Sequence, residues 1–409
     1  MIVGIDDTDS ATRGMCTTYL AAVVAERVSS FGEVQDRLLV RLNPDVEHKT
    51  RGNAALALRI ETDQPERVEE AVAGAVERHA VLDDERTNPG VAFLRGEPTD
   101  ALAEYTGTVV HEYVTPERAR RVADKNDVRV RGWENGRGIV GATAALGAPL
   151  AFEDWTYELL VYRGSDEWGE PRRVSLDSFF DAHRATYPRT WDTVDEQTGE
   201  VVAVPNTHGP VVYGLRGTFG GVWEANAYVD VEGAERVAVY RTNQGTDAHL
   251  TDARVGATRD GGSYRVEGTV VGEPETREGG HVFFHIEDDE RLRCAAFEPT
   301  GRFRDTVKSL RERDRVVVCG SRADGTLKIE KMRVVSLNRT REAKPTCCGR
   351  RMESAGRGKG YRCRDDGCDE TADSLVEERI ERELDERWYE VPPSARRHLA
   401  KPLVRHETV

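Results

Sequence analysis

Residues 264–335 contain five short apolar segments, YRVEGTVV (264–271), HVFFHI (281–286), LRCAAF (292–297), RVVVCG (315–320) and LKIEKMRVV (327–335). Each is rich in β-branched or aromatic residues and is bounded by turn-forming or charged residues, which is typical of strands. A helical pattern from Phe303 to Arg313 falls between the third and fourth segments. Five strands with a helix at that place is the order of an OB-fold, a small barrel that binds single-stranded nucleic acid. We therefore predict an OB-fold β-barrel over residues 260–338.

A cysteine cluster follows the predicted barrel, in CCGRRMESAGRGKGYRCRDDGC from Cys347 to Cys368. Clustered cysteines in a chain without a secretory signal indicate metal binding before disulfides. Two cysteine pairs joined by a basic, glycine-containing hairpin are similar to a zinc ribbon. Zinc ribbons normally open with Cys-x-x-Cys, whereas Cys347 and Cys348 are adjacent here. Two alternatives stay open: four zinc ligands, Cys347, Cys348, Cys363 and Cys368, or a degenerate ribbon that lacks one.

The C-terminal segment has apolar residues at steps of four, namely Val376, Ile380, Leu384 and Trp388. With Asp373 and Ser374 in front as caps, this spacing predicts an amphipathic helix that stops before Pro392. We assign the zinc ribbon and this C-terminal helix together to residues 344–409.

The N-terminal half alternates between strand and helix patterns. Strands are expected at residues 2–6, 38–42 and 54–60, and helices at 17–30 and from Pro65. This order favours an α+β domain with helices on one side of a mixed sheet, which we place at residues 1–126. Strand patterns at 157–163 and 211–217 predict a second α+β domain over residues 127–252, in which the polar stretch 164–206 is a candidate insertion. The fold class is therefore α+β, with several domains.

The charge of the chain is unevenly distributed. The 409 residues carry 73 Asp and Glu against 58 Lys and Arg, a net charge of −15, and only 8 of the cations are Lys. An acidic surface nearly free of Lys is what a salt-rich cytoplasm favours, so we expect a halophilic source. Residues 301–364 nevertheless carry a net charge of +12. A basic barrel and ribbon on an acidic protein favour a docked polyanion, and a solvated charged helix is the alternative.

Membrane and secretion signals are not expected. No run of eighteen apolar residues occurs, so we predict no membrane span. The sequence MIVGIDD reaches carboxylates by its sixth residue, which argues against a secretory signal. We expect a cytoplasmic protein.

The opening segment GIDDTDS, residues 4–10, places Asp6, Asp7 and Asp9 at the end of the first strand. Neighbouring carboxylates supply the hard oxygen ligands of Mg²⁺, which usually also holds substrate phosphates. An acidic turn is the alternative. The following RGMCTTYL favours the metal, because a helix start with free N–H groups and hydroxyls is a phosphate site. The candidate phosphate-binding residues in it are Arg13, Gly14, Thr17 and Thr18.

A second candidate phosphate site is RLNPDVEHKTRGNAA, residues 41–55. Lys and Arg beside a flexible Gly between two strands suit a phosphate clamp, and an ordinary basic hairpin is the alternative. The candidates are Lys49, Thr50, Arg51, Gly52 and Asn53. The glycine-rich GRGIVGA, residues 136–142, is weaker, since such a stretch either cradles phosphate or lets a helix pack closely.

Eight segments in order carry a resemblance: VGIDDTDS, RGMCTTYLA, RLNP, KTRGNAA, GRGIVGA, DWTYELLVYR, VVYGLRG and RTNQGTDAHL. With the expected barrel and ribbon, they resemble the archaeal tRNA-Ile 2-agmatinylcytidine synthetase (TiaS) family over nearly the whole chain. The resemblance implies that residues 1–126 form an ATP-dependent kinase-like domain and residues 127–252 a ferredoxin-like domain. The contracted Cys347–Cys348 pair departs from the family pattern.

The resemblance also implies the reaction. ATP would phosphorylate the C2 oxygen of the wobble cytidine in the isoleucine tRNA with a CAU anticodon. Agmatine would then displace the phosphate, with release of AMP and phosphate, so that the anticodon reads AUA instead of AUG. Since agmatine is a dication, its pocket should be acidic or rich in carbonyl oxygens.

Residue roles and cofactors come with the resemblance. Asp6, Asp7 and Asp9 match the acidic motif, assigned here to Mg²⁺, and Thr17 falls where the family carries a phosphorylated threonine. Lys49, Arg51 and Asn53 would bind ATP phosphates, and the ribbon would hold Zn²⁺. Two other hypotheses remain: a non-enzymatic single-stranded nucleic-acid-binding protein built on the OB-fold and ribbon, and an ATP-dependent enzyme for another amine or RNA.

Overall fold

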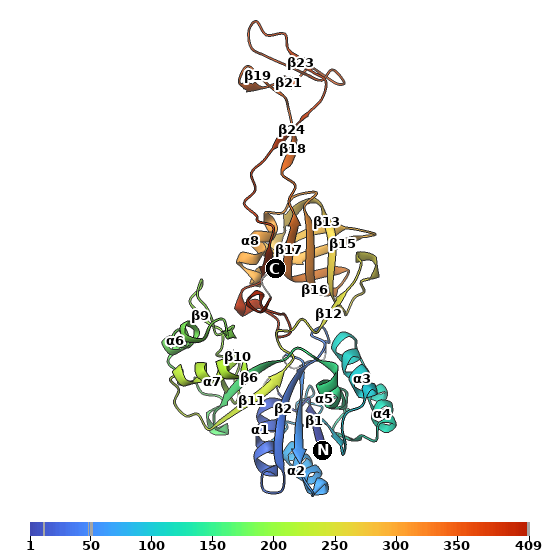
Figure 1. Cartoon of the computed structure of the whole chain (residues 1–409), viewed down its shortest axis with the longest axis vertical. Helices are drawn as coiled ribbons and strands as arrows, with labels where there is room; N and C mark the ends of the chain where they lie inside the picture. The colour runs from blue at the N-terminus through green and yellow to red at the C-terminus, as the bar shows by residue number, and fades with distance from the viewer. Residues whose placement is uncertain (11–12, 48, 50–51, 407–409) are drawn as a thin grey trace.

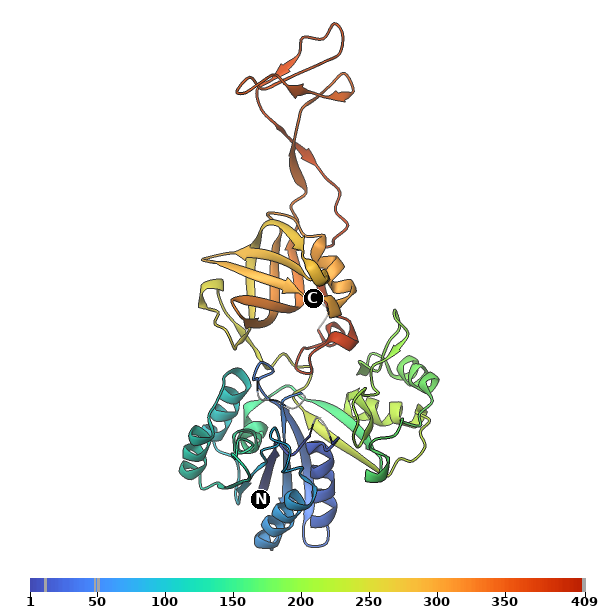
Figure 2. The same ribbon diagram turned by 180° about the vertical axis from the view of Figure 1, so that it is seen from behind.

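The computed structural model describes residues 1–10, 13–47, 49 and 52–406. It shows an elongated molecule with three parts in a row (Figures 1 and 2). A wide sheet with helices lies at one end and a β-barrel in the middle. A small ribbon lies at the far end of a thin stalk.

The two predicted α+β halves share one sheet of nine strands. In spatial order the strands are β5 (Arg129–Gly132), β4 (Gly90–Leu94), β1 (Ile2–Asp6), β3 (Ala54–Glu61), β2 (Glu33–Arg41), β11 (Arg236–Thr242), β6 (Thr156–Tyr162), β10 (Val211–Gly217) and β7 (Thr190–Trp191). The halves meet where β11 pairs parallel with β2, with Arg241 opposite Leu38. The other pairings in this sheet are antiparallel.

Helices cover both faces of the sheet. One face is covered by α1 (Thr17–Val28) and α2 (Pro65–His79). The other face is covered by α3 (Asp100–His111), α4 (Pro116–Lys125) and α5 (Ile139–Ala151). The expectation of helices on one side is therefore wrong. Val3 packs under α1 and Ile2 under α5, because the apolar run at residues 2–5 does not alternate and so is buried on both faces.

The region 164–232 contributes β7 and β10 to the sheet, and the rest of it covers one face of the second half of the sheet. It contains α6 (Leu176–Thr186), the hairpin of β8 (Val194–Asp195) with β9 (Glu200–Val201), and α7 (Phe219–Tyr228). Leu159 and Val161 of β6 pack against these helices. No helix in the described part of the chain is long and apolar enough to cross a membrane.

The glycines of GRGIVGA serve close packing of α5. A Cβ added at Gly138 would lie 2.7 Å from the carbonyl oxygen of Asp6, and one added at Gly4 would lie 1.9 Å from that of Ala142. Backbone therefore meets backbone where α5 crosses β1, an approach that only glycine allows. Of the two alternatives for this motif, the structure supports helix packing.

The central part is a closed five-stranded barrel. Its strands are β13 (Ser263–Thr276), β14 (Val282–Glu287), β15 (Arg291–Ala296), β16 (Arg315–Ala323) and β17 (Thr326–Ser336). They pair in the order β13-β14-β15-β17-β16, and β16 pairs back with β13, which closes the barrel. The short strand β12 (Leu250–Asp252) pairs parallel with the start of β13. The helix α8 (Arg302–Lys308) lies between the third and fourth strands as predicted, although it ends before Arg313. Cys294 of β15 and Cys319 of β16 are buried.

The far end consists of a stalk and a ribbon of short strands. The stalk pairs β18 (Thr340–Ala343) with β24 (Val376–Arg379). Beyond it lie β19 (Thr346–Cys347), β20 (Arg350–Arg351), β21 (Glu353–Ser354), β22 (Tyr361–Arg362) and β23 (Thr371–Ala372). The chain then returns along the stalk to the barrel, where β25 (Trp388–Glu390) pairs with β17.

The predicted C-terminal helix is wrong, because residues 376–390 are strand and extended chain. Side chains four residues apart share one face of a strand as well as of a helix, so the spacing fits both. The apolar residues also have different surroundings: Val376 is 43% exposed on the stalk, whereas Leu384 is 6% exposed in the barrel core.

A buried ion pair anchors this returning chain. Arg382 is only 2% exposed and donates to both carboxylate oxygens of Asp314, at 2.8 and 2.7 Å. It also donates to the carbonyl oxygens of Ser309 and Asn338. A helix would place Arg382 on its polar face, and the barrel instead buries it with full hydrogen bonding.

Candidate active site

A cavity of about 280 Å³ opens where the end of β1, the start of α1 and the loop after β2 converge. Its lining draws on segments that are distant in the sequence: Asp6, Asp7, Asp9, Cys16, Thr17, Thr18, Arg41, Lys49, Gly52, Asn53, Arg137, Gly141, Glu158, Arg172, His208 and His398. Polar side chains from both predicted α+β halves and from the C-terminus therefore face one space.

The three opening carboxylates lie together in this cavity. Asp6 accepts a hydrogen bond from the backbone N–H of Asp7 at 2.7 Å, and Asp7 has a left-handed backbone with φ of 55°. Arg137 donates to one Asp7 oxygen through Nε at 3.1 Å and a terminal nitrogen at 2.8 Å. Burial and the neighbouring Asp7 raise the pKa of Asp6 well above its usual range, and burial raises the pKa of Asp7 to about 7. Crowded, desolvated carboxylates favour a bound cation.

Gly141 of α5 makes the space for this cluster. A Cβ at Gly141 would lie 2.1 Å from Oδ2 of Asp6. The glycine-rich segment thus contributes to the cavity by giving room to a carboxylate.

The start of α1 holds the acidic loop. Thr8 donates to the hydroxyl of Thr17, both through its own hydroxyl at 3.1 Å and through its backbone N–H at 3.4 Å. Thr17 and Thr18 are both buried and both line the cavity. The sequence predicted this meeting of the helix start and the acids.

Arg13 and Gly14 lie outside the lining. Arg13 is exposed and pairs with Asp83 at 2.7 Å. Gly14, with φ of 81°, crosses closely over Gly209, since a Cβ would lie 2.9 Å from the Gly209 Cα. Gly14 therefore allows the loop containing His208 to approach the cavity.

The loop between β2 and β3 forms another wall of the cavity. Lys49, Gly52 and Asn53 line the cavity, and Thr50 and Arg51 lie outside the described residues. Asn53 donates to the carbonyl oxygen of Asn43 at 2.9 Å, and Lys49 to that of Pro44. The two candidate phosphate segments therefore face each other across one space.

A buried network of hydrogen bonds and ion pairs forms the floor of the cavity, and the sequence did not predict it. Glu158 accepts hydrogen bonds from Gln244 at 2.6 Å and Arg216 at 3.2 Å, and Arg41 lies 3.6 Å away. Asn243 bonds both backbone groups of Arg41, at 2.8 and 3.0 Å. The signal was a carboxylate inside the apolar strand DWTYELLVYR; its partners come from three other segments, Gln244 from RTNQGTDAHL, Arg216 from VVYGLRG and Arg41 from RLNP.

The outer face of the barrel carries aromatic rings with cations over them. Phe283 and Phe297 lie 6.4 Å apart. Arg277 and Arg293 lie 4.8 and 5.3 Å from the Phe283 ring, and Lys328 lies 5.8 Å from the Phe297 ring. Rings and cations in this arrangement suit base stacking and phosphate contact.

A second cavity of about 680 Å³ lies between this barrel and the sheet. Arg322, Lys328 and Arg397 line it, and it shares Lys49 and His398 with the first cavity. Cationic side chains therefore extend from the barrel face to the candidate active site.

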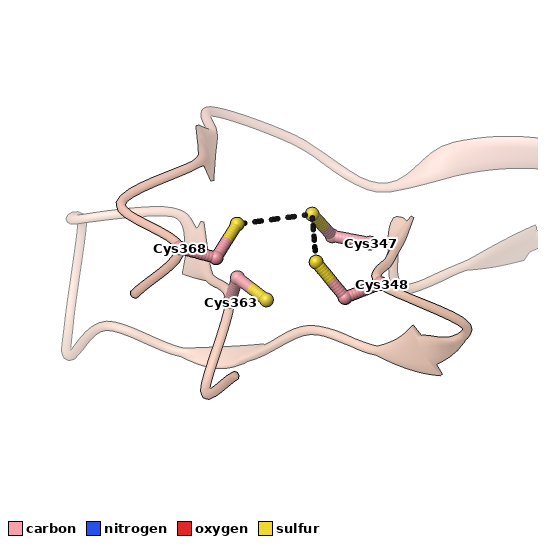
Figure 3. Close-up of side chains that lie close together, drawn as sticks. All are labelled: Cys347, Cys348, Cys363 and Cys368. Atoms are coloured by element: carbon pink, nitrogen blue, oxygen red, sulfur yellow. Dashed lines mark hydrogen bonds between the residues drawn. The ribbon is translucent and has the colours of Figure 1, made fainter. Parts of the chain in front are cut away.

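The four ribbon cysteines form a compact cluster, with their sulfur atoms within 4.8 Å of one another (Figure 3). Cys347 Sγ lies 3.8 Å from that of Cys348 and 3.5 Å from that of Cys368. A tetrahedral site with bonds of about 2.3 Å has sulfur atoms about 3.8 Å apart. Cys348 takes a left-handed backbone, with φ of 47°, which turns adjacent cysteines toward one centre. The geometry fits the four-ligand alternative.

These features define a multidomain α+β protein. A cavity lined by both carboxylates and cationic side chains lies on its sheet, which is joined to a closed barrel and a cysteine ribbon. Three family models match the chain: the TiaS TCKD domain at residues 2–68, the TiaS FLD domain at 136–249 and the TiaS C-terminal zinc ribbon domain at 344–384. The chain belongs to the TiaS family.

Curated relatives and solved structures agree along the whole length. The tRNA(Ile2) 2-agmatinylcytidine synthetase TiaS of Methanosarcina mazei is 46% identical over 100% of this chain and 98% of its own. The protein of the same name from Haloquadratum walsbyi is 42% identical over 99% and 97%. A TiaS–tRNA(Ile2)–ATP complex is 43% identical with a TM-score of 0.92, and a TiaS–tRNA(Ile2)–AMPCPP–agmatine complex is 40% identical with a TM-score of 0.88. Each covers 100% of this chain and 97% of its own.

Proposed function

We propose that this protein conjugates agmatine to C2 of the wobble cytidine in the isoleucine tRNA with a CAU anticodon, at the expense of ATP. The observation that carries the proposal is the meeting of Asp6, Asp7, Asp9, Thr17 and Lys49 in one cavity. The relatives named for this reaction, and their complexes with tRNA, ATP and agmatine, support the substrates.

The cavity would bind ATP between the two facing segments. Asp6, Asp7 and Asp9 would hold Mg²⁺, which when bound neutralises phosphate charge. The backbone N–H groups at Thr17 and Thr18 would bind phosphate oxygens. The loop candidates, Lys49, Thr50, Arg51, Gly52 and Asn53, would bind them from the other side. Arg13 is left out of this set because it pairs with Asp83 at the surface.

Activation of the cytidine follows from the chemistry of its C2 oxygen. This ring oxygen is a poor leaving group until it carries a phosphoryl group, after which the agmatine amine displaces it as phosphate. Phosphoryl transfer depends mainly on positioning and charge neutralisation, which the cavity supplies. Agmatine is a dication, and Glu112 at the wall would balance part of its charge, since Glu158 at the floor is already paired with Arg41 and Arg216. Thr17 is proposed as the phosphorylated threonine of the kinase-like domain.

The barrel and the ribbon would hold the tRNA. We assign the barrel to the OB-fold class, on the strand order and the position of α8, and its Phe283–Phe297 face to base stacking. The four ribbon cysteines would hold one Zn²⁺. The domain limits 1–126, 127–252, 260–338 and 344–409 are proposed as well, although the first two share one sheet. We also propose that the acidic surface reflects a salt-rich cytoplasm.

The decisive experiment incubates the purified protein at high salt with ATP, Mg²⁺, labelled agmatine and the tRNA transcript. Label at the wobble base is expected, and the methionine tRNA, which shares the CAU anticodon, serves as the specificity control. Tight RNA binding without ATP turnover would instead indicate a binding protein. Incorporation of another amine in preference to agmatine would show that agmatine is not the substrate amine.

A further inference from the structure

The C-terminal segment, residues 391–406, passes between the barrel and the nine-stranded sheet, and we call it the C-terminal strap (Figure 2). It follows β25, and its backbone bonds to the loop after β11. The N–H groups of Gly245 and Asp247 donate to the carbonyl oxygens of His398 and Leu399, each at 2.8 Å. The strap is therefore held in register against the sheet.

Ion pairs fix the strap on both sides of His398. Arg396 pairs with Asp192 next to β7, and with Glu390 at 2.7 Å. Arg405 pairs with Asp154 at 2.7 Å, just before β6. Arg397 lies 3.2 Å from Asp45, in the loop after β2. These partners lie on separate elements around the candidate active site, so the position of His398 is set by several independent contacts.

His398 is the strap residue that lines the first cavity. Its Nδ1 lies 2.9 Å from a terminal nitrogen of Arg216, whose Nε contacts Glu158 on the cavity floor. Its ring also lies against Gly52: a Cβ added at Gly52 would be 2.8 Å from the ring Cδ2 and 3.0 Å from Nε2. One imidazole thus touches both the floor and the loop that carries the phosphate-binding candidates.

The chemistry of this contact sets the state of the ring. A guanidinium only donates, so Nδ1 of His398 must accept, and the ring proton lies on Nε2. Burial, with Arg41 and Arg216 nearby, lowers the pKa of His398 well below its usual value. A neutral imidazole near the guanidinium groups of Arg41 and Arg216 can accept a hydrogen bond from Arg216 without adding a third positive charge.

We propose that His398 is a positioning residue of the active site: by accepting a hydrogen bond from Arg216 and packing on Gly52, it fixes the floor network and the end of the β2–β3 loop at Gly52 and Asn53 in one arrangement. The C-terminus, about 240 residues beyond the floor carboxylate, thereby completes the cavity. This inference rests on the proposed function and adds a residue that acts through Arg216 rather than on the substrate.

The test compares three variants of the full-length protein. His398→Ala removes the acceptor and the packing, whereas His398→Asn keeps an acceptor at the position of Nδ1. His406→Ala is the matched control, because His406 lies on the same strap but outside the cavity lining, beside Trp388 and Lys331. For His398→Ala we expect kcat for agmatine incorporation to fall about 10-fold or more, with unchanged tRNA affinity and only a small fall in melting temperature. His398→Asn should recover most of the loss.

Amide hydrogen exchange at Arg41 and Leu42, whose N–H groups donate to Asn243 in the floor network and to the carbonyl oxygen of Asn53 in the loop, supplies a readout that does not need turnover. Exchange should quicken in His398→Ala and stay near the wild-type rate in the other two variants. Wild-type kcat and wild-type exchange in His398→Ala would overturn the inference, as would equal losses in His398→Ala and His406→Ala. A wild-type protein without turnover would count against the proposed function, and the exchange measurement would still decide the positioning role.

Discussion

Gly141→Ala should disable the carboxylate cluster while leaving the fold intact. The added Cβ would lie 2.1 Å from Oδ2 of Asp6, and contacts under 3.0 Å essentially never occur, so the two must separate by about 1 Å. The carboxylate is the group that moves, because Gly141 is part of α5, whose backbone is already packed on β1 at Gly4. Moving it disturbs the bond from the Asp7 N–H to Asp6. A misplacement of about 1 Å in a catalytic group costs on the order of 100-fold in rate.

Stability should change much less than turnover. Overpacking costs about 1–3 kcal/mol, and replacing a helical Gly by Ala returns up to about 1 kcal/mol. Gly107→Ala is the control, since Gly107 lies within α3 with nothing near its added Cβ. It should raise the free energy of unfolding by about 0.5–1 kcal/mol and leave activity unchanged.

The assay measures ATP-dependent incorporation of labelled agmatine into the tRNA transcript, alongside tRNA affinity and urea unfolding. We expect the rate of Gly141→Ala to fall about 100-fold, with wild-type tRNA affinity. Wild-type turnover in this variant would refute the reasoning, because Asp6 could then leave its place without consequence. Equal losses in Gly107→Ala would show that helix substitution in general, and not the Asp6 contact, lowers the rate.

Three further predictions follow from other parts of the molecule. Asp7→Asn removes a proposed Mg²⁺ ligand, so AMP release should stop while tRNA affinity stays nearly intact, and surviving turnover would remove Asp7 from the metal site. Cys348→Ser should abolish bound zinc in elemental analysis, because four sulfur ligands would fall to three; a zinc-free, folded wild-type protein would contradict the four-ligand ribbon. Arg382→Ala leaves Asp314 as an unpaired buried charge, so denaturation should show the barrel destabilised by about 3–5 kcal/mol. Arg387→Ala, at an exposed site, should stay within about 0.5 kcal/mol, and equal effects of these two Arg variants would argue against the buried pair.

Several local predictions were confirmed because they depend on short stretches of chain. The five barrel strands and the helix between the third and fourth match β13–β17 and α8, since each strand carries its own apolar pattern. The opening acids and the threonines of α1 lie together because only nine residues separate Asp7 from Thr17.

Other predictions failed where a pattern fits two structures. The four-residue spacing of Val376, Ile380 and Leu384 suits a strand as well as a helix, and only the pairing of β24 with β18 and the burial of Arg382 select the strand. The apolar run at residues 2–5 could have indicated helices on both faces of the sheet, since it does not alternate.

By itself, the sequence determined most local elements, though not the C-terminal segment, together with the acidic and basic segments, the cysteine cluster and the family resemblance, because these depend on residue type and spacing. Only the tertiary structure decided which distant segments share the cavity. Glu158, Arg216 and Gln244 meet through the pairing of β6 with β10 and β11, and the C-terminal strap adds His398; no local pattern records such long-range contacts. The reason is physical: a buried polar side chain must find its partner wherever the fold places one, at any separation along the chain.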